Sequence, residues 1–112
     1  MSDCLFCRII DGEIPGDFVL VNDDVVAFRD INPKAPVHVL VVPRLHVASV
    51  ADLAAQAPQT LASMAQAAQQ IADAESGGQF RWVFNTGELA GQTVFHVHGH
   101  VIAGGELGWD PA

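Results

Sequence analysis

Apolar residues along the first third of this chain fall in short runs that are typical of β-strands. The runs "FVLV" at 18–21 and "VVAFR" at 25–29 are separated by "NDD", which indicates a hairpin turn. A third run, "VHVLVVP" at 37–43, has Pro36 and Pro43 at its ends. The pattern therefore predicts three consecutive strands.

The middle of the chain changes to helical spacing. In an Ala- and Gln-rich segment the larger apolar residues recur on one helical face, namely Leu61, Met64, Ala68 and Ile71. Pro58 stands near the start of the segment and Gly77-Gly78 follow its end, as helix boundaries favour. We predict one amphipathic helix at about 58–75, with its apolar stripe in the core.

Strand patterns return at 80–84 ("FRWVF") and 93–103 ("TVFHVHGHVIA"). The order strand, strand, strand, helix, strand, strand predicts an α+β fold. We expect a mostly antiparallel five-stranded sheet, covered on one side by the long helix, in a single domain spanning 1–112.

The last predicted strand carries three histidines, His96, His98 and His100, on alternate positions. Side chains two apart share a face of a strand, so the imidazoles form a row, and Val97, Gly99 and Val101 point to the other face. The row could be packing, a three-histidine metal site, or a nucleophile with helpers. Rings ~6.6–7 Å apart converge poorly on one ion, which favours the third reading.

Composition narrows the function further. A net charge of −8 with no basic stripe argues against binding nucleic acid. No apolar run approaches the ~20 residues of a membrane span, and the start "MSDCLFCRII" lacks the order of a signal peptide, so we expect a cytoplasmic protein. In a reducing compartment, the pair Cys4 and Cys7 indicates metal or redox chemistry.

The segment "HVHGHVI" resembles the signature of the histidine triad superfamily of nucleotide hydrolases and transferases. The stretches "CLFCRIIDGEIP" (4–15), "AFRDINPKAPVHVLVVPRLH" (27–46), "NTGELAGQTVFHVHGHV" (85–101) and "GGELGWDP" (104–111) resemble its Hint branch. The resemblance implies the fold of that superfamily and a homodimeric purine nucleoside phosphoramidase that releases a nucleoside monophosphate such as AMP.

The resemblance also implies catalytic roles. His98 would attack the α-phosphorus and form a nucleotidyl-imidazole, chemistry that suits a neutral imidazole near pH 7. His100 would donate to the phosphate and protonate or orient the leaving group. His38 would support the triad through hydrogen bonds, and the hydroxyl of Thr93 would hold phosphate oxygens.

By the same resemblance Asp30 would accept the ribose hydroxyls, although a turn-capping carboxylate is the alternative. The walls of the base pocket would be Phe6, Ile10, Phe28 and Ile31; for Phe6 and Phe28, core packing is the alternative. The remaining substrate-binding residues would be Asn85, Gln92 and Trp109, the last of them contributed by the partner subunit.

Some triad proteins bind zinc, and here the implied ligands are Cys4, Cys7, His46 and His96. A Cys₂His₂ set completes a tetrahedral shell, so this zinc would be structural. The alternative is a pair of thiols that bind no metal beside a partly exposed His46.

Gly99 departs from the signature, which has a large apolar residue at this position. We expect a local packing change against the helix, with the chemistry retained; a loosened triad strand is the alternative. His100 argues against the transferase branch, which has glutamine there. A dinucleoside polyphosphate hydrolase of the Fhit type and a nucleotide-binding regulatory module with incidental hydrolysis remain as alternative functions.

Overall fold

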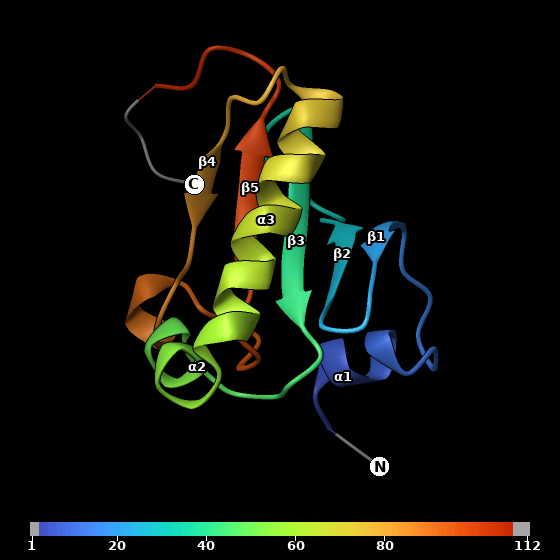
Figure 1. The fold of residues 1–112 in the computed structure, drawn as a ribbon, viewed down its shortest axis with the longest axis vertical. Helices are drawn as coiled ribbons and strands as arrows, with labels where there is room; N and C mark the ends of the chain where they lie inside the picture. The colour runs from blue at the N-terminus through green and yellow to red at the C-terminus, as the bar shows by residue number, and fades with distance from the viewer. Residues whose placement is uncertain (1–2, 109–112) are drawn as a thin grey trace.

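A five-stranded antiparallel sheet forms the centre of the molecule (Figure 1). The computed structural model describes residues 3–108. Its strands lie in the order β1-β2-β3-β5-β4 and are β1 (Phe18–Val21), β2 (Val25–Arg29), β3 (Val37–Pro43), β4 (Arg81–Val83) and β5 (Gly99–Ala103). The bounds of β1, β2 and β3 confirm the prediction, and the α+β class is as expected.

The long helix α3 (Pro58–Glu75) crosses one face of the sheet, also as predicted (Figure 1). Two shorter helices, α1 (Leu5–Ile10) and α2 (Val50–Gln56), were not predicted, because each is too short to show a helical period. Local caps begin both: the sulfur of Cys4 accepts from the Cys7 amide, and the Ser49 hydroxyl accepts from the Asp52 amide. A short 3₁₀ helix, η1 (Glu88–Ala90), follows β4.

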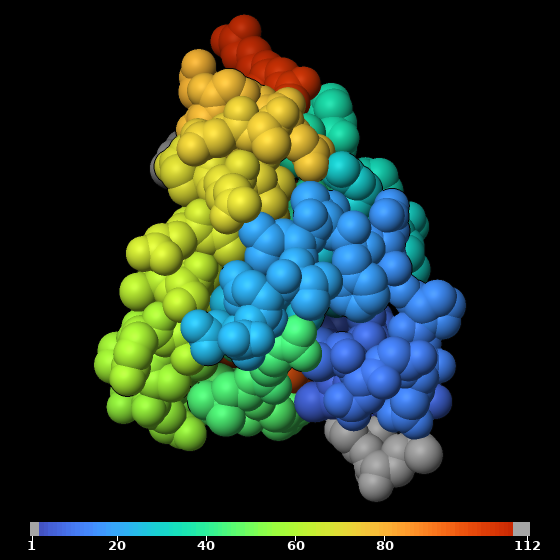
Figure 2. Space-filling model, turned by 45° about the vertical axis from the view of Figure 1, so that its right-hand side comes forward, coloured from blue at the N-terminus to red at the C-terminus, as the bar shows by residue number. Residues whose placement is uncertain are grey.

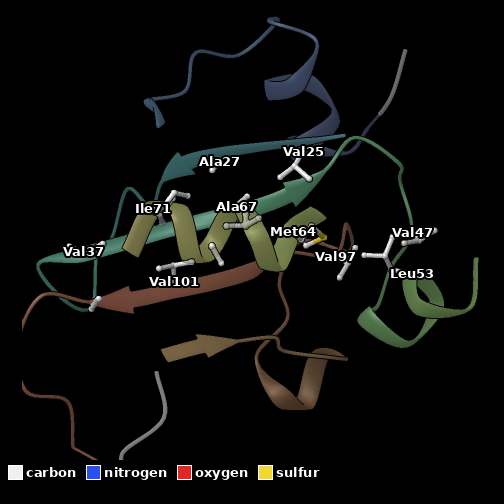
Figure 3. Packing of buried hydrophobic residues seen from close by; sticks show 14 residues of the cluster. Val25, Ala27, Val37, Val47, Leu53, Met64, Ala67, Ile71, Val97 and Val101 are labelled. Carbon is white, nitrogen blue, oxygen red and sulfur yellow. The ribbon is translucent and has the colours of Figure 1, made fainter. Parts of the chain in front are cut away.

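The apolar stripe of α3 packs on the sheet (Figure 3). Met64, Ala68 and Ile71 are buried against alternate residues of the strands, among them Val39 and Val101. Removal of this much apolar surface from water is the main stabilisation that positions the strands.

The opposite face of the sheet is covered in part by α1, whereas the sequence predicted cover on one side only. Phe6 of α1 packs with Phe28 and Leu40 from β2 and β3. In Figure 2 the segments of the N-terminal part, in blue, gather beside α3 on one side of the molecule. Phe6, Phe28 and Leu40 belong to a second core cluster on this face, and Phe6 connects it to the ring of His98.

The last strand is shorter than predicted. β5 begins at Gly99, opposite Val41 of β3, so residues 93–98 lie outside the sheet. The ladder ends there because the amide of Val97 donates instead to the carbonyl of Val47, in the loop after β3, at 2.8 Å. β4 is likewise shorter than the expected 80–84.

Gly99 faces the α3 side of the sheet, where the side-chain atoms nearest to a Cβ built on it belong to Trp82 and Phe84. Among the described residues, no helix is long and apolar enough to cross a membrane.

Candidate active site and metal site

A cleft of about 570 Å³ opens on the α1 side of the sheet, where β2, β3 and β5 approach the loop before β5. Its walls are mostly apolar. Polar groups reach it from Asp30, Thr93, His98 and His100. An apolar cleft with a few convergent polar groups is the usual form of a small-molecule site.

His98 is held by its own backbone neighbourhood. Its Nδ1 lies 2.7 Å from the carbonyl oxygen of His96, which can only accept, so we assign the proton to Nδ1. Phe6 packs edge-on against the ring at 4.8 Å between centroids. The neutral ring therefore carries its lone pair on Nε2, the nitrogen suited to nucleophilic attack.

His100 is tied to His38 by a chain of hydrogen bonds. The amide of Lys34 donates to Nδ1 of His38 at 3.0 Å, which places the proton of His38 on Nε2. That Nε2 lies 2.9 Å from Nδ1 of His100 and 3.4 Å from a carboxylate oxygen of Asp30. His100 accepts at Nδ1, so its own proton lies on Nε2.

All three of these rings stay neutral near pH 7. Burial lowers the pKa of His38, His98 and His100 below the ordinary histidine value, because a charged imidazolium loses solvation there. For His100 burial is the largest cause, and repulsion from the protonated forms of His98 and His38 adds to it, so the pKa falls to about 4. A neutral imidazole can offer a lone pair on one nitrogen and an N–H donor on the other.

Asp30 serves two purposes in the described structure. One carboxylate oxygen accepts from the amide of Asn32 at 2.8 Å, which is the turn cap that the sequence left open as an alternative. The carboxylate also lies at the cleft wall beside His38. Turn capping and a partly buried acceptor at the cleft are therefore compatible.

The loop between β4 and β5 brings Thr93 to the cleft and keeps Gln92 out of it. Gln92 is buried; its amide nitrogen donates to the carbonyls of Ala48 and Val94, and its side-chain oxygen accepts from the amide of Gly87. The Gln92 side chain thus braces the loop, and the predicted phosphate contact through the backbone N–H groups of this loop stays a prediction. Asn85, half-buried in the same loop, lies outside the cleft wall.

The apolar wall of the cleft differs from the prediction at one residue of α1. Phe6, Phe28 and Ile31 line the cleft, and Ile31 is almost fully exposed at its rim. Ile10 packs on the second core cluster without reaching the cleft, and Ile9 lines it instead. Since α1 was not predicted, its facing residues Leu5 and Ile9 were missed; a helical reading of residues 5–10 would have found them.

His96 belongs to a different cluster from the other two triad histidines. Its Nε2 donates to the carbonyl of Pro43 at 2.7 Å, so the lone pair lies on Nδ1. That Nδ1 is 3.5 Å from the sulfur atoms of both Cys4 and Cys7 and 3.1 Å from Nδ1 of His46. The sulfur of Cys7 lies 3.4 Å from Nδ1 of His46.

These four residues fit a tetrahedral metal. All their ligand atoms lie within 4.8 Å of one another. A zinc ion with bonds of about 2.0–2.3 Å would place neighbouring N and S ligands roughly 3.4–3.8 Å apart, close to the distances found. The hydrogen bond from His96 to Pro43 orients the ring, and histidines that bind metals commonly donate their other ring N–H in this way. The cluster could hold a metal ion.

Trp109 lies outside the residues that the structure describes, so its predicted place near the cleft stays a prediction.

Comparison with known proteins places these features in a family. Residues 3–107 match the family model described as "Scavenger mRNA decapping enzyme C-term binding". The chain is 40% identical over 109 residues to the purine nucleoside phosphoramidase of Escherichia coli strain K12, covering 96% of this chain and 92% of that protein.

Solved structures agree with the sequence relatives. A HIT family hydrolase from Legionella pneumophila superposes with a TM-score of 0.92 at 38% identity, over 98% of this chain and all of that one. A histidine triad protein from Clostridium difficile gives a TM-score of 0.89 at 37% identity, over 99% of this chain and 98% of that one.

Proposed function

Because this chain belongs to the histidine triad superfamily and is a hydrolase of that family, we propose that it is a purine nucleoside phosphoramidase. It cleaves the P–N bond of nucleoside 5′-phosphoramidates and releases a nucleoside monophosphate such as AMP. The observation that carries the proposal is the bonding of His98, whose Nδ1 proton is held by the His96 carbonyl while the ring lines the cleft. The relative that bears this name supports the choice of substrate.

In the first step Nε2 of His98 attacks the α-phosphorus, and the P–N bond to the leaving group breaks. The leaving amine takes up a proton from solvent, which the proton released in the second step replaces, and the nucleotidyl group is held on His98. In the second step a water oxygen attacks phosphorus, the P–Nε2 bond breaks, and the water proton is released as the monophosphate departs. A neutral imidazole suits both steps as nucleophile and then as leaving group.

His100 acts as a donor to the reacting phosphoryl group. Its Nδ1 accepts from His38, so its Nε2–H is left to donate to a phosphate oxygen or to the leaving group. His38 fixes this tautomer through its bond from the Lys34 amide. Thr93, exposed at the cleft, supplies a hydroxyl for a phosphate oxygen.

The purine lies against the apolar wall formed by Phe6, Phe28 and Ile31. Asp30, at the same wall, accepts hydrogen bonds from the ribose hydroxyls. An acidic protein can still bind the phosphate anion, because the attraction comes from local N–H and O–H dipoles.

The Cys₂His₂ cluster holds a structural zinc. The four ligand atoms and the orientation of His96 support this assignment, and a metal with four protein ligands has no open position for substrate. When bound, the ion joins α1, the loop after β3 and the segment before β5. Its role is to hold Cys4, His46 and His96 together close to the nucleophile.

We also propose that the protein acts in the cytoplasm as a two-fold homodimer, with Trp109 of each subunit near the cleft of the other. β4 lies at one edge of the sheet and is therefore placed to extend it across a dimer axis.

A substrate panel tests the activity. Purified protein should hydrolyse adenosine 5′-phosphoramidate faster than diadenosine polyphosphates, with AMP as the common product. His98→Ala, assayed in parallel, controls for contaminating hydrolases. Faster turnover of the dinucleotides would make the protein a dinucleoside polyphosphate hydrolase, and tight AMP binding with turnover of neither would make it a binding module.

A further inference from the structure

Gly99 occupies the only position between the two histidines of the cleft, and no side chain fits there. A Cβ atom built on Gly99 would lie 2.1 Å from Nε1 and 2.6 Å from Cε2 of Trp82, and 2.8 Å from Cζ of Phe84. All three distances are far below van der Waals contact. The volume that the triad signature gives to a large apolar residue is therefore filled from another strand.

Trp82 fills that volume from β4. It is opposite Val101 of β5, and its half-buried ring packs on the α3-side core and edge-on to Phe84, with 4.7 Å between centroids. Its Nε1 is buried and has no hydrogen-bond partner in the described part of the chain. A buried indole N–H normally finds a partner, so close packing over Gly99 determines where this ring lies.

We propose that Trp82 is a positioning residue for the catalytic histidines. Its indole replaces the side chain that the signature has at position 99 and fixes the backbone of residues 98–100 from behind. The catalytic consequence rests on the proposed function. This backbone carries both rings, that of His98, bonded to the His96 carbonyl, and that of His100, bonded to His38.

A double-mutant cycle tests the exchange of volume between the two strands. G99M alone forces methionine against the indole and should lower kcat for adenosine 5′-phosphoramidate by about 10²-fold, the scale of a small misplacement of reacting groups. W82L alone leaves space above Gly99 and should lower the melting temperature. The double variant W82L/G99M returns the volume to β5 and should recover most of the kcat lost in G99M.

Two controls separate positioning from general damage. The affinity for AMP should stay within about threefold of wild type in all folded variants, because the base and ribose wall lies on the other face of the sheet, and uniform loss of binding would appear in KM. G105A, at a glycine with no atom near its would-be Cβ, should change neither kcat nor stability.

A measurement without turnover keeps the test independent of the proposed function. In wild-type protein, ¹⁵N chemical shifts of the rings should show the proton of His98 on Nδ1 and that of His100 on Nε2. G99M, or the milder G99A if G99M does not fold, should mix these tautomers, and the matching W82L double variant should restore them. Unchanged tautomers and kcat in G99A and G99M, or a double variant no better than the single glycine substitution, would overturn the proposal. Absence of phosphoramidase activity in wild type with an intact tautomer cycle would overturn the proposed function alone.

Discussion

The hydrogen-bond partners of each imidazole decide what that histidine can do. The carbonyl of His96 holds one nitrogen of His98 and leaves a lone pair on the other, whereas His38 holds one nitrogen of His100 and leaves an N–H group on the other. The same residue type, two positions apart, thus suits the two different roles that we propose.

The first prediction concerns these two histidines. His98→Ala should lower kcat by several powers of ten. Loss of the nucleophile in a Ser-His-Asp enzyme costs about 10⁶, which sets the scale. His100→Ala should cost less, about 10²–10⁴, because it removes only a donor. AMP binding should persist in both, as calorimetry can check.

Mass spectrometry of quenched wild type, with a slowly released substrate, should show a nucleotidyl group on the peptide that contains His98. An adduct mapped to His96 or His100, or substantial activity in His98→Ala, would mean that the roles are wrongly assigned.

The second prediction is the pH dependence that His100 imposes. Its pKa of about 4 means that the folded protein keeps this ring neutral at pH values where an unfolded chain, with an ordinary value near 6.5, takes up a proton. The unfolded state binds more protons between these values, so the free energy of unfolding should fall as the pH falls through this window. Denaturant unfolding at pH 7 and pH 5 measures the effect, and His100→Asn should make it smaller.

The pH profile of kcat/KM gives an independent check. Activity should be retained below pH 6 and decline toward pH 4, after correction for acid hydrolysis of the phosphoramidate. A decline centred near pH 6.5 that reports on His100 would contradict the lowered pKa.

At the scale of elements, the four residues of the Cys₂His₂ cluster come from three segments that lie outside the strands of the sheet. Cys4 and Cys7 come from the start of α1, His46 from the loop after β3, and His96 from the segment before β5. Phe6, which lies between the two cysteines on α1, packs against the ring of His98. A metal ion at the cluster would therefore stabilise the wall of the cleft.

The third prediction tests that ion. Purified protein should contain close to one zinc per chain, and Cys7→Ser should lose it together with a drop in melting temperature, because a structural metal contributes folding free energy. Leu45→Ala, at an exposed residue next to His46, is the matched control and should keep both. Metal-free wild type of unchanged stability would exclude the structural zinc.

At the scale of the whole molecule, the edge formed by β4 is the feature that bears on the proposed dimer. Within residues 3–108, Arg81–Val83 pair with β5 alone, so the other side of β4 is an edge of the sheet that these residues form. An edge of this kind can be completed by the same strand of a second copy.

The fourth prediction is a homodimer in solution. Light scattering at micromolar concentration should give twice the chain mass of 11.9 kDa. Trp109→Ala should alter the preference among leaving groups more than it alters folding, since its predicted place is near the partner's cleft. A monomer at that concentration would contradict the dimer.

The sequence by itself determined the elements whose signals are local. Three strands and α3 were found with their bounds, because the period of buried side chains and the prolines and glycines at their ends are readable over a few residues. The alternation of His98 and His100 and the linked motifs also indicated a triad hydrolase before any contact was known.

Tertiary structure decided how those residues divide the chemistry. His96 leaves the row because β5 begins only at Gly99 and the segment before it turns toward Cys4, 92 positions away. Gln92 turns inward to bond Ala48, and Trp82 takes the space above Gly99. Such outcomes depend on which distant backbone groups and side chains meet once the sheet has formed, and no local period along the chain records them.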